Sequence, residues 1–311
     1  MKIGIIGGTG FVGSHVVDKL VADGHRIRLL TRPGSEGKAP VDEAVEPVPG
    51  DIGDEVAVRA CLDGCDAAVY LIGILREDPK AGISFDALQR RGAERAIGIA
   101  AELGVGRFLL MSANGVDAAQ TPYQTTKLVA EEALKASGLD WTIFRPSVIF
   151  GDPRGRMEFC TQLKEELIDS PMPAPLFYDG LKPTGAGAFE LAPVHVDDVA
   201  AAFAAALAQP ESIGQTLELC GPDNLSWKEI LKAIAAASGK SKLMLPAPVM
   251  LIAPVAGVMD RFKWFPVSRD QLVMLLAGNT CAEDGFARLG LTPRSFDQVT
   301  LSYLAVQGPS S

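Results

Sequence analysis

One glycine pattern near the start of the chain constrains its fold more than any other feature: Gly7-x-x-Gly10-x-x-Gly13. A short apolar segment, residues 2–6, precedes the pattern, and apolar residues at helical spacing follow it over residues 12–21. A second apolar segment comes next, at residues 27–31. The order strand, glycine turn, helix, strand is the context in which such glycines bind a dinucleotide.

Each glycine of this pattern has a predicted task. Gly7 lets the chain turn sharply off the strand, Gly10 lets the backbone approach a pyrophosphate, and Gly13 lets the helix pack closely on the sheet. The start of the helix then offers unpaired N–H groups and a partial positive charge to the phosphates. The alternative is a glycine-rich turn that holds no ligand.

The residues after the second strand indicate which nucleotide is preferred. A protein that binds NAD usually has Asp or Glu there, because a carboxylate bonds the ribose 2′-hydroxyl. This chain has Arg32 and Ser35 instead, with Lys38 nearby. Because a guanidinium pairs with a 2′-phosphate, we predict NADP(H) over NAD(H). The alternative is that Arg32 is a solvated loop cation.

Two further strands are predicted to end at the same edge of the sheet. Residues 45–48 precede Asp51, which either accepts from the adenine amino group or caps a helix that starts near Asp54. Residues 67–72 precede Gly73, where a small residue lets backbone lie against the cofactor.

Tyr123 and Lys127 are candidates for proton transfer. They lie four apart at the start of a predicted helix, and so share one face of it. An ammonium beside a phenol lowers the phenol pKa, and the phenol can then exchange a proton with a carbonyl or alcohol. Ser112 follows the fifth strand, residues 107–111, and is predicted to hold the substrate oxygen.

Together these motifs resemble the short-chain dehydrogenase/reductase superfamily, and the likeness extends to about residue 240. Its extended branch is indicated by Asp51, by Phe144-Arg145-Pro146 and by His195-Val196-Asp197-Asp198. The resemblance implies an α/β fold, a Rossmann-type doubly wound parallel sheet with a smaller C-terminal substrate lobe. We expect a dinucleotide-binding domain at residues 1–150 and the lobe at 151–311, with some segments returning to the Rossmann core.

Three segments, residues 70–75, 111–115 and 144–151, are similar to an atypical group within this superfamily. That group contains the NAD(P)H-binding accessory subunit of respiratory complex I and its bacterial relatives, and its nucleotide can serve structure rather than turnover. The resemblance implies these cofactor-binding residues: Gly7, Thr9, Gly10, Phe11, Val12, Gly13, Arg32, Ser35, Asp51, Ile52, Leu71, Ile72, Gly73, Met111, Ser112, Tyr123, Lys127, Pro146 and Val148.

Composition excludes several classes of protein. With 29 Lys and Arg against 38 Asp and Glu, the net charge of −9 argues against nucleic-acid binding. Five cysteines without a C-x-x-C pair argue against a disulfide framework and a zinc site, and we expect no metal. Free thiols and the lack of a secretory signal at the start predict a cytoplasmic protein.

The second lobe offers fewer candidates. Arg154 and Arg156 either bind an anionic substrate or are exposed loop cations, and His195 is predicted to be structural, with Asp197 capping the next helix. The uncharged residues 243–259 and the cations and aromatics after them suit three roles: contact with the inner membrane surface, the lining of an apolar substrate pocket, or a buried or partner-covered helix pair.

Three functions follow as hypotheses. The first is an NADP(H)-dependent oxidoreductase that acts on a small carbonyl or quinone-like substrate, with Tyr123, Lys127 and Ser112 as catalytic residues. The second is a non-catalytic NADPH-holding accessory or assembly protein in contact with a respiratory complex. The third is an NAD-dependent nucleotide-sugar epimerase or dehydratase.

Overall fold

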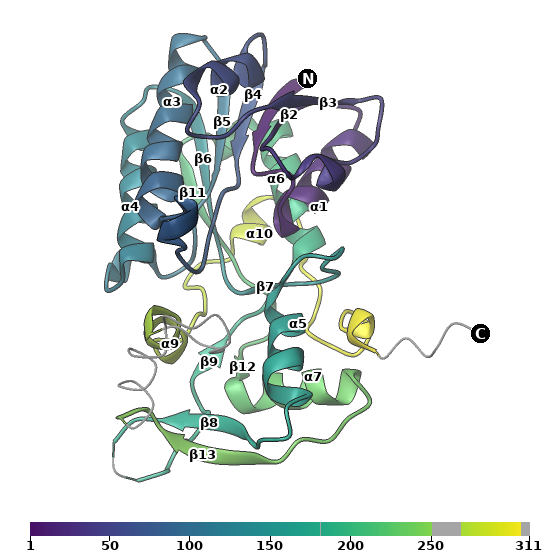
Figure 1. Ribbon diagram of the computed structural model, residues 1–311, viewed down its shortest axis with the longest axis vertical. Coiled ribbons are helices and arrows are strands. Elements are labelled where there is room, and N and C mark those ends of the chain that lie inside the picture. Colours follow the sequence, from purple (N-terminus) through teal and green to yellow (C-terminus); the bar gives the residue numbers. More distant parts are fainter. Residues whose placement is uncertain (181, 251–268, 306–311) are drawn as a thin grey trace, which may run out of the picture. The chain divides into compact units, whose positions relative to one another are not determined.

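The computed structural model describes residues 1–180, 182–250 and 269–305 (Figure 1). The chain divides into two compact units, which we call unit 1 and unit 2. Unit 1 comprises Met1–Pro146, Val196–Leu219 and Ala282–Thr292. Unit 2 comprises Ser147–His195, Cys220–Cys281 and Pro293–Ser311. Two segments that follow residue 150 in the chain therefore belong to unit 1.

Unit 1 is built on a parallel sheet, as predicted. Among the described residues the sheet has seven strands in the order β11-β6-β5-β4-β1-β2-β3, and every neighbouring pair is parallel. The strands are β1 (Lys2–Ile6), β2 (Arg26–Thr31), β3 (Val45–Pro49), β4 (Ala67–Tyr70), β5 (Arg107–Met111), β6 (Asp140–Pro146) and β11 (Gln215–Leu219). This order confirms the Rossmann-type doubly wound fold.

Helices cover both faces of this sheet (Figure 1). One layer contains α2 (Glu55–Leu62), α3 (Gly92–Glu102) and α4 (Pro122–Lys135), and a π-helical turn, η3 (Asp86–Arg91), leads into α3. The other layer contains α1 (Phe11–Ala22) and α6 (Val196–Ala208). Short turns connect the elements: η1 (Glu36–Lys38), η2 (Pro79–Ala81), η4 (Val116–Ala118), η6 (Pro210–Ser212) and α10 (Gly285–Arg288).

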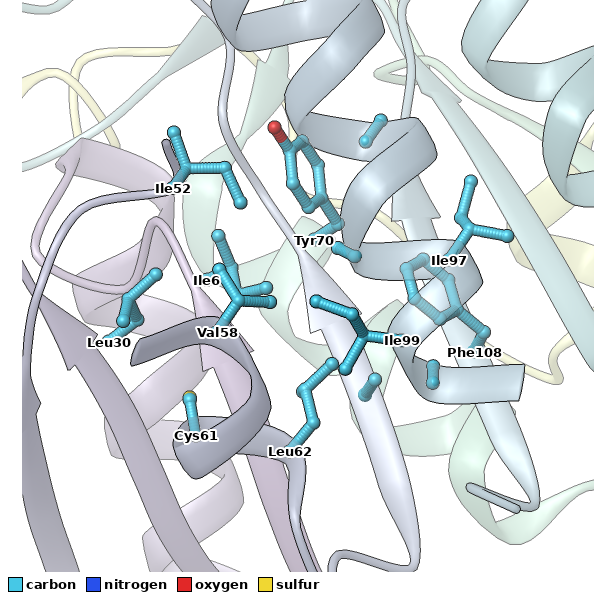
Figure 2. Packing of buried hydrophobic residues seen from close by; sticks show 14 of the residues in the cluster. Ile6, Leu30, Ile52, Val58, Cys61, Leu62, Tyr70, Ile97, Ile99 and Phe108 are labelled. Atoms are coloured by element: carbon cyan, nitrogen blue, oxygen red, sulfur yellow. The ribbon is translucent and has the colours of Figure 1, made fainter. Parts of the chain in front are cut away.

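The core beneath α2 and α3 is apolar (Figure 2). Val58 and Leu62 of α2 and Ile97 of α3 pack with Ile6 and Phe108 of the sheet, and all five are buried. Burying one such side chain stabilises the fold by about 1.5–3 kcal/mol. This packing fixes α2 and α3 on the sheet.

Unit 2 contains three small two-stranded sheets in its described part. β8 (Ala174–Tyr178) pairs in parallel with β13 (Met244–Pro248), β7 (Ile149–Phe150) pairs with β10 (Val194–His195), and β9 (Glu190–Leu191) pairs with β12 (Leu225–Ser226). The helical elements are α5 (Phe159–Leu163), η5 (Lys164–Ile168), α7 (Trp227–Ala237), α9 (Arg269–Leu276) and η7 (Ser302–Leu304).

Residues 296–304 have apolar side chains at helical spacing, but only Ser302–Leu304 form a helical turn, η7. The carboxylate of Asp297 accepts from the backbone N–H groups of Val299 (2.9 Å) and Thr300 (3.0 Å). Such a local bond competes with helix formation. In the uncharged segment 243–259, residues 244–248 form β13, and residues 251–259 lie outside the described residues.

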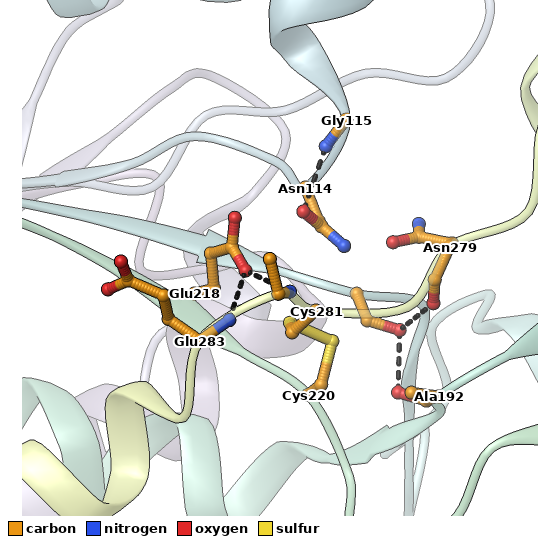
Figure 3. Close-up of a disulfide and its surroundings, with 10 residues drawn as sticks. Asn114, Gly115, Ala192, Glu218, Cys220, Asn279, Cys281 and Glu283 are labelled. Atoms are coloured by element: carbon orange, nitrogen blue, oxygen red, sulfur yellow. Dashed lines mark hydrogen bonds between the residues drawn. A yellow bond between two sulfur atoms is a disulfide. The ribbon is translucent and has the colours of Figure 1, made fainter.

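The prediction that the cysteines form no disulfide is also wrong. Cys220, directly after β11, is bonded to Cys281 across a sequence separation of 61 (Figure 3). This distance along the chain explains why no local motif revealed the pair. The other cysteines, Cys61, Cys65 and Cys160, are buried free thiols.

Two features are absent from the described residues. Within them, no three His, Cys, Asp or Glu side chains are grouped so that they could hold a metal ion. No helix in the same part of the chain has the length and apolar character needed to cross a membrane.

Candidate dinucleotide and proton-transfer site

The glycine turn between β1 and α1 has the geometry that the sequence predicts. Gly7 has a φ of +92°, which favours glycine, and its carbonyl accepts from the N–H of Gly10 at 3.1 Å. A Cβ on Gly13 would lie 2.2 Å from the Gly7 oxygen, so only glycine fits there. A Cβ on Gly10 would meet the same oxygen at 3.3 Å and no other atom of the described residues within 4 Å.

The start of α1 is open to an anion. Gly10 is the N-cap residue, and no side chain of the described residues caps the helix there. The first turn contains no acidic residue. The backbone N–H groups of this first turn and the positive end of the helix dipole therefore suit an anionic group beside Gly10. These residues fit a pyrophosphate.

Arg32 and Ser35 lie together after β2. The Arg32 Nε donates to the Ser35 hydroxyl at 3.2 Å, and Ser35 is buried while Arg32 is exposed. The serine thus orients a guanidinium at the strand end. Lys38 follows in η1.

Asp51 does not cap the helix after it. Asp54 is the N-cap of α2 and accepts from the N–H groups of Val56 (2.9 Å) and Ala57 (3.3 Å). The exposed Asp51 accepts from the N–H of Gly53 at 2.9 Å instead. The capping alternative is therefore wrong for Asp51, and the adenine contact stays a prediction.

Lys127 is held at the ends of two central strands. Its Nζ donates to the carbonyl oxygens of Ile72 (3.0 Å) and Met111 (2.8 Å), and its side chain is buried. β4 ends at Tyr70, two residues before Ile72, whereas the sequence predicts a strand to residue 72. Burial lowers the pKa of Lys127 to about 8.

Gly73 leaves room beside this ammonium. A Cβ at Gly73 would lie 3.5 Å from the Lys127 Nζ, and nothing else in the described residues would come as close to it. Among the described contacts, two of the three N–H donors of Lys127 are used. One donor therefore remains for a ligand.

Tyr123 differs from expectation in its acidity. Its half-buried ring packs edge-on against Phe85 with ring centroids 5.8 Å apart. Burial raises the pKa of the Tyr123 hydroxyl to about 12, whereas the sequence predicts a lower pKa. The physical reason is that the Lys127 ammonium is directed to the carbonyls of Ile72 and Met111 instead.

Ser112 is engaged inside unit 1. Its hydroxyl donates to the carboxylate of Glu131 at 2.5 Å, and both residues are buried. Arg145 of β6 completes this group, because its guanidinium donates twice to Glu131. The structure therefore gives Ser112 a partner in α4, and its role toward a substrate oxygen stays a prediction.

The π-helical turn η3 connects the loop after β4 with α4. Gln89 is buried; its Nε2 donates to the Ile74 carbonyl at 2.8 Å, and its Oε1 accepts from the Thr126 hydroxyl at 3.1 Å. The turn begins directly after Phe85, which packs on Tyr123. Gln89 thus ties together the two elements that carry Gly73 and Lys127.

Other predicted residues are distributed over both units. Leu71, whose N–H donates to the Ile6 carbonyl at 2.9 Å, continues β4, and Ile52 is buried in the unit 1 core. Thr9, Phe11, Val12 and Pro146 also belong to unit 1. Val148 belongs to unit 2, where it packs against the core of that unit.

The residues of the histidine motif contact side chains of their own units. His195 of β10 packs against Phe150, and its Nδ1 lies 3.0 Å from an Arg294 guanidinium nitrogen. Asp197 lies within the first turn of α6 rather than at its N-cap, and its carboxylate lies 2.7 Å from the His15 Nδ1 of α1.

Sequence reasoning missed Glu131 and Gln89. An arginine in the apolar strand 140–146 needs a buried acidic partner, because a lone buried charge is costly. Glu131, which lies four residues after Lys127 on the same helix face, is an acidic residue that could be this partner of Arg145. Gln89 offered no comparable signal in the sequence.

Comparison with known proteins agrees with this geometry. Residues 7–171 match the model of a family described as NAD(P)H-binding. The chain is 24% identical to the NADH-ubiquinone oxidoreductase 40 kDa subunit of Neurospora crassa, over 96% of this chain and 78% of that protein. It is 29% identical to the ceramide reductase of Caulobacter vibrioides, over 81% of this chain and 75% of that protein.

A solved structure shows the same fold. The UDP-glucose 4-epimerase of Thermus thermophilus, in complex with NAD, superposes with a TM-score of 0.73 at 18% identity, over 98% of this chain and 97% of that chain. The likeness concerns the fold alone. On the family match and the site geometry, the chain belongs to the NAD(P)H-binding family and is an atypical short-chain dehydrogenase/reductase that resembles the accessory subunit of complex I.

Proposed function

We propose that this chain binds NADP(H) and reduces a small apolar carbonyl or quinone-like substrate. The observation that carries the proposal is the arrangement on α4. A buried Lys127 keeps one N–H donor beside Gly73, and Tyr123 lies one helical turn earlier. The ceramide reductase among the relatives supports reduction of an apolar substrate.

The preference for NADP(H) rests on the end of β2. A ribose 2′-phosphate would meet the guanidinium of Arg32, which Ser35 orients at 3.2 Å. Arginine suits this task because its planar fork matches phosphate oxygens. Residues of the glycine turn and the start of α1 would hold the pyrophosphate.

Tyr123 would act as the proton donor. When bound, the reduced nicotinamide supplies a hydride to the carbonyl carbon. The Tyr123 hydroxyl gives its proton to the carbonyl oxygen, and the product is an alcohol. A pKa of about 12 keeps the hydroxyl protonated at neutral pH, so that it holds the proton which the carbonyl oxygen receives.

A second candidate is an NADPH-holding accessory or assembly protein at the surface of a respiratory complex. It is favoured by the hydrogen bond from Ser112 to Glu131, which occupies the serine hydroxyl. It is also favoured by the similarity to the 40 kDa subunit, whose alignment covers 96% of this chain. In this case the chain would be cytoplasmic or peripheral to the inner membrane, and the nucleotide would stabilise it without turnover.

One experiment tests both candidates. The purified chain is titrated with NADPH and NADH, and NADPH oxidation is then followed with aldehydes, ketones and quinones. We expect tighter binding of NADPH and a loss of turnover by about 100-fold or more in Tyr123→Phe. Binding without oxidation would favour the accessory role, and tight binding of a UDP-sugar with NAD would favour an epimerase.

Arg32→Ala tests the coenzyme preference. We expect NADPH affinity to fall by about 10- to 100-fold while NADH affinity changes little, because a charge-assisted bond is lost. Arg26→Ala is the matched control, since Arg26 is an exposed arginine at the other end of the same strand. Equal loss of both coenzymes in Arg32→Ala would contradict the 2′-phosphate assignment.

A further inference from the structure

The carboxylate of Glu131 lies in the interior of unit 1. Its side chain is 0% exposed, and it follows Lys127 by one helical turn on α4. Tyr123, Lys127 and Glu131 therefore share one face of the helix. A carboxylate in such a place is costly unless it is paired, so its contacts indicate what it does.

Those contacts join three elements. Glu131 accepts from the Arg145 Nε at 2.9 Å, from an Arg145 terminal nitrogen at 2.7 Å, and from the Ser112 hydroxyl at 2.5 Å. The other side of Arg145 donates to Asp117 of η4 at 2.5 and 3.0 Å. The Lys135 Nζ lies 3.7 Å from a carboxylate oxygen of Glu131, and the Lys135 side chain is partly exposed. The network fixes α4 against the ends of β5 and β6.

Glu131 also acts on Lys127 through its charge. Burial lowers the pKa of Lys127, and the nearby carboxylate of Glu131 opposes this shift. Tyr123 lies one turn before Lys127 on α4, and Arg145 of β6 pairs with Glu131. The strand ends at Ile72 and Met111 offer only carbonyl oxygens.

We propose that Glu131 is a positioning residue of this site: its buried carboxylate, one helical turn from Lys127 on α4, attracts the ammonium and holds Ser112 at the end of β5 through a hydrogen bond. The inference rests on the proposed binding of a nicotinamide cofactor beside Lys127. A charged lysine offers its third N–H to a ligand at neutral pH, whereas a neutral amine offers a weaker donor.

The test measures the titration of Lys127 in the full chain without cofactor. Lysines are labelled with ¹³C, the Cε resonance of Lys127 is assigned by its loss in Lys127→Arg, and its shift is followed from about pH 6 to 11. We expect the midpoint to fall by about one pH unit in Glu131→Gln. Glu132→Gln is the matched control, because that neighbouring side chain is 63% exposed, and its midpoint should equal that of the wild type.

A second readout links the titration to binding. NADPH affinity, measured by nicotinamide fluorescence, should weaken with rising pH at a lower midpoint in Glu131→Gln than in the wild type. Coinciding Lys127 midpoints in these two proteins would overturn the inference. A lowered midpoint in a chain that binds no NADPH would support the role of Glu131 and overturn the proposed function.

Glu131→Asp covers the case in which Glu131→Gln does not fold. Its carboxylate is one methylene shorter, and we expect the Lys127 midpoint to fall by about half a pH unit. An unchanged midpoint in this variant would overturn the inference.

Discussion

The Nζ of Lys127 donates to the carbonyl oxygen of Met111 at 2.8 Å, at the end of a central strand. Burial lowers the pKa of this lysine from 10.5 to about 8. Between these two pH values the folded protein loses the proton before the unfolded chain does. The unfolded state therefore binds more protons there, and the contribution of Lys127 to the free energy of unfolding rises with pH.

We expect this rise to disappear in Lys127→Met. Urea unfolding of both proteins at pH 7.5, 8.5 and 9.5 isolates the contribution of Lys127, because the other lysines cancel in the difference. The wild type should gain roughly 2 kcal/mol relative to the variant over this range. A difference that does not change with pH would show that the lysine titrates normally.

Tyr123 should give the opposite slope at higher pH. Burial raises its pKa from 10.0 to about 12, so the folded protein keeps a proton that the unfolded chain loses. The stability due to this hydroxyl is fully present below pH 10 and is lost as the pH rises toward 12. Unfolding of the wild type and Tyr123→Phe at pH 9.5, 10.5 and 11 measures it, and the wild type should lose stability relative to the variant.

Two glycine-to-alanine changes should have opposite effects. A Cβ at Gly13 would lie 2.2 Å from the Gly7 oxygen, so Gly13→Ala should cost about 1–3 kcal/mol and lower coenzyme affinity more than tenfold. A Cβ at Gly98 of α3 meets nothing within 4 Å, and Gly98→Ala should stabilise by about 0.5–1 kcal/mol. Thermal unfolding with and without NADPH compares the two.

Removing the buried guanidinium should be severe. Arg145→Met leaves the 0% exposed Glu131 without its main cation, and we expect the free energy of unfolding to fall by about 3–5 kcal/mol. Arg288→Met is the control, because Arg288 and Glu283 form an ion pair whose side chains are 49% and 61% exposed. Its loss should cost about 0–1 kcal/mol. Similar losses in both variants, measured by urea unfolding, would contradict the importance of burial.

The disulfide should stabilise unit 2 by constraining the unfolded chain. Cys220 and Cys281 close a loop with a sequence separation of 61, for which chain entropy gives about 4 kcal/mol. We expect Cys281→Ser and the reduced wild type to lose this amount equally in urea unfolding. A reductant should then have no further effect on the variant, and an effect there would point to another cause.

Local features of the sequence predicted the nucleotide-binding part well. The glycine turn, the strand and helix around it, and the face shared by Tyr123 and Lys127 depend on residues a few positions apart. Helical and strand periodicity reports such relationships directly. The sheet order followed from the resemblance that these motifs support.

Contacts between distant residues were the ones that the sequence did not reveal. The partner of Cys220 lies 61 positions away, and the carboxylate that engages Ser112 lies on a different element. The acidity of Tyr123 was mispredicted for the same reason, because the direction of the Lys127 ammonium depends on the carbonyls of two strands. Spacing on one helix cannot show where a side chain finds its hydrogen-bond partners.

The place of β11 in the sheet has a consequence for how the chain is synthesised. This strand pairs with β6, with Gln215 opposite Thr142, so the edge of β6 stays open while the residues between them are translated. An open strand edge with unpaired N–H and C=O groups invites pairing with other chains. A chain that ends before residue 215 would therefore expose the β6 edge to pairing with other chains.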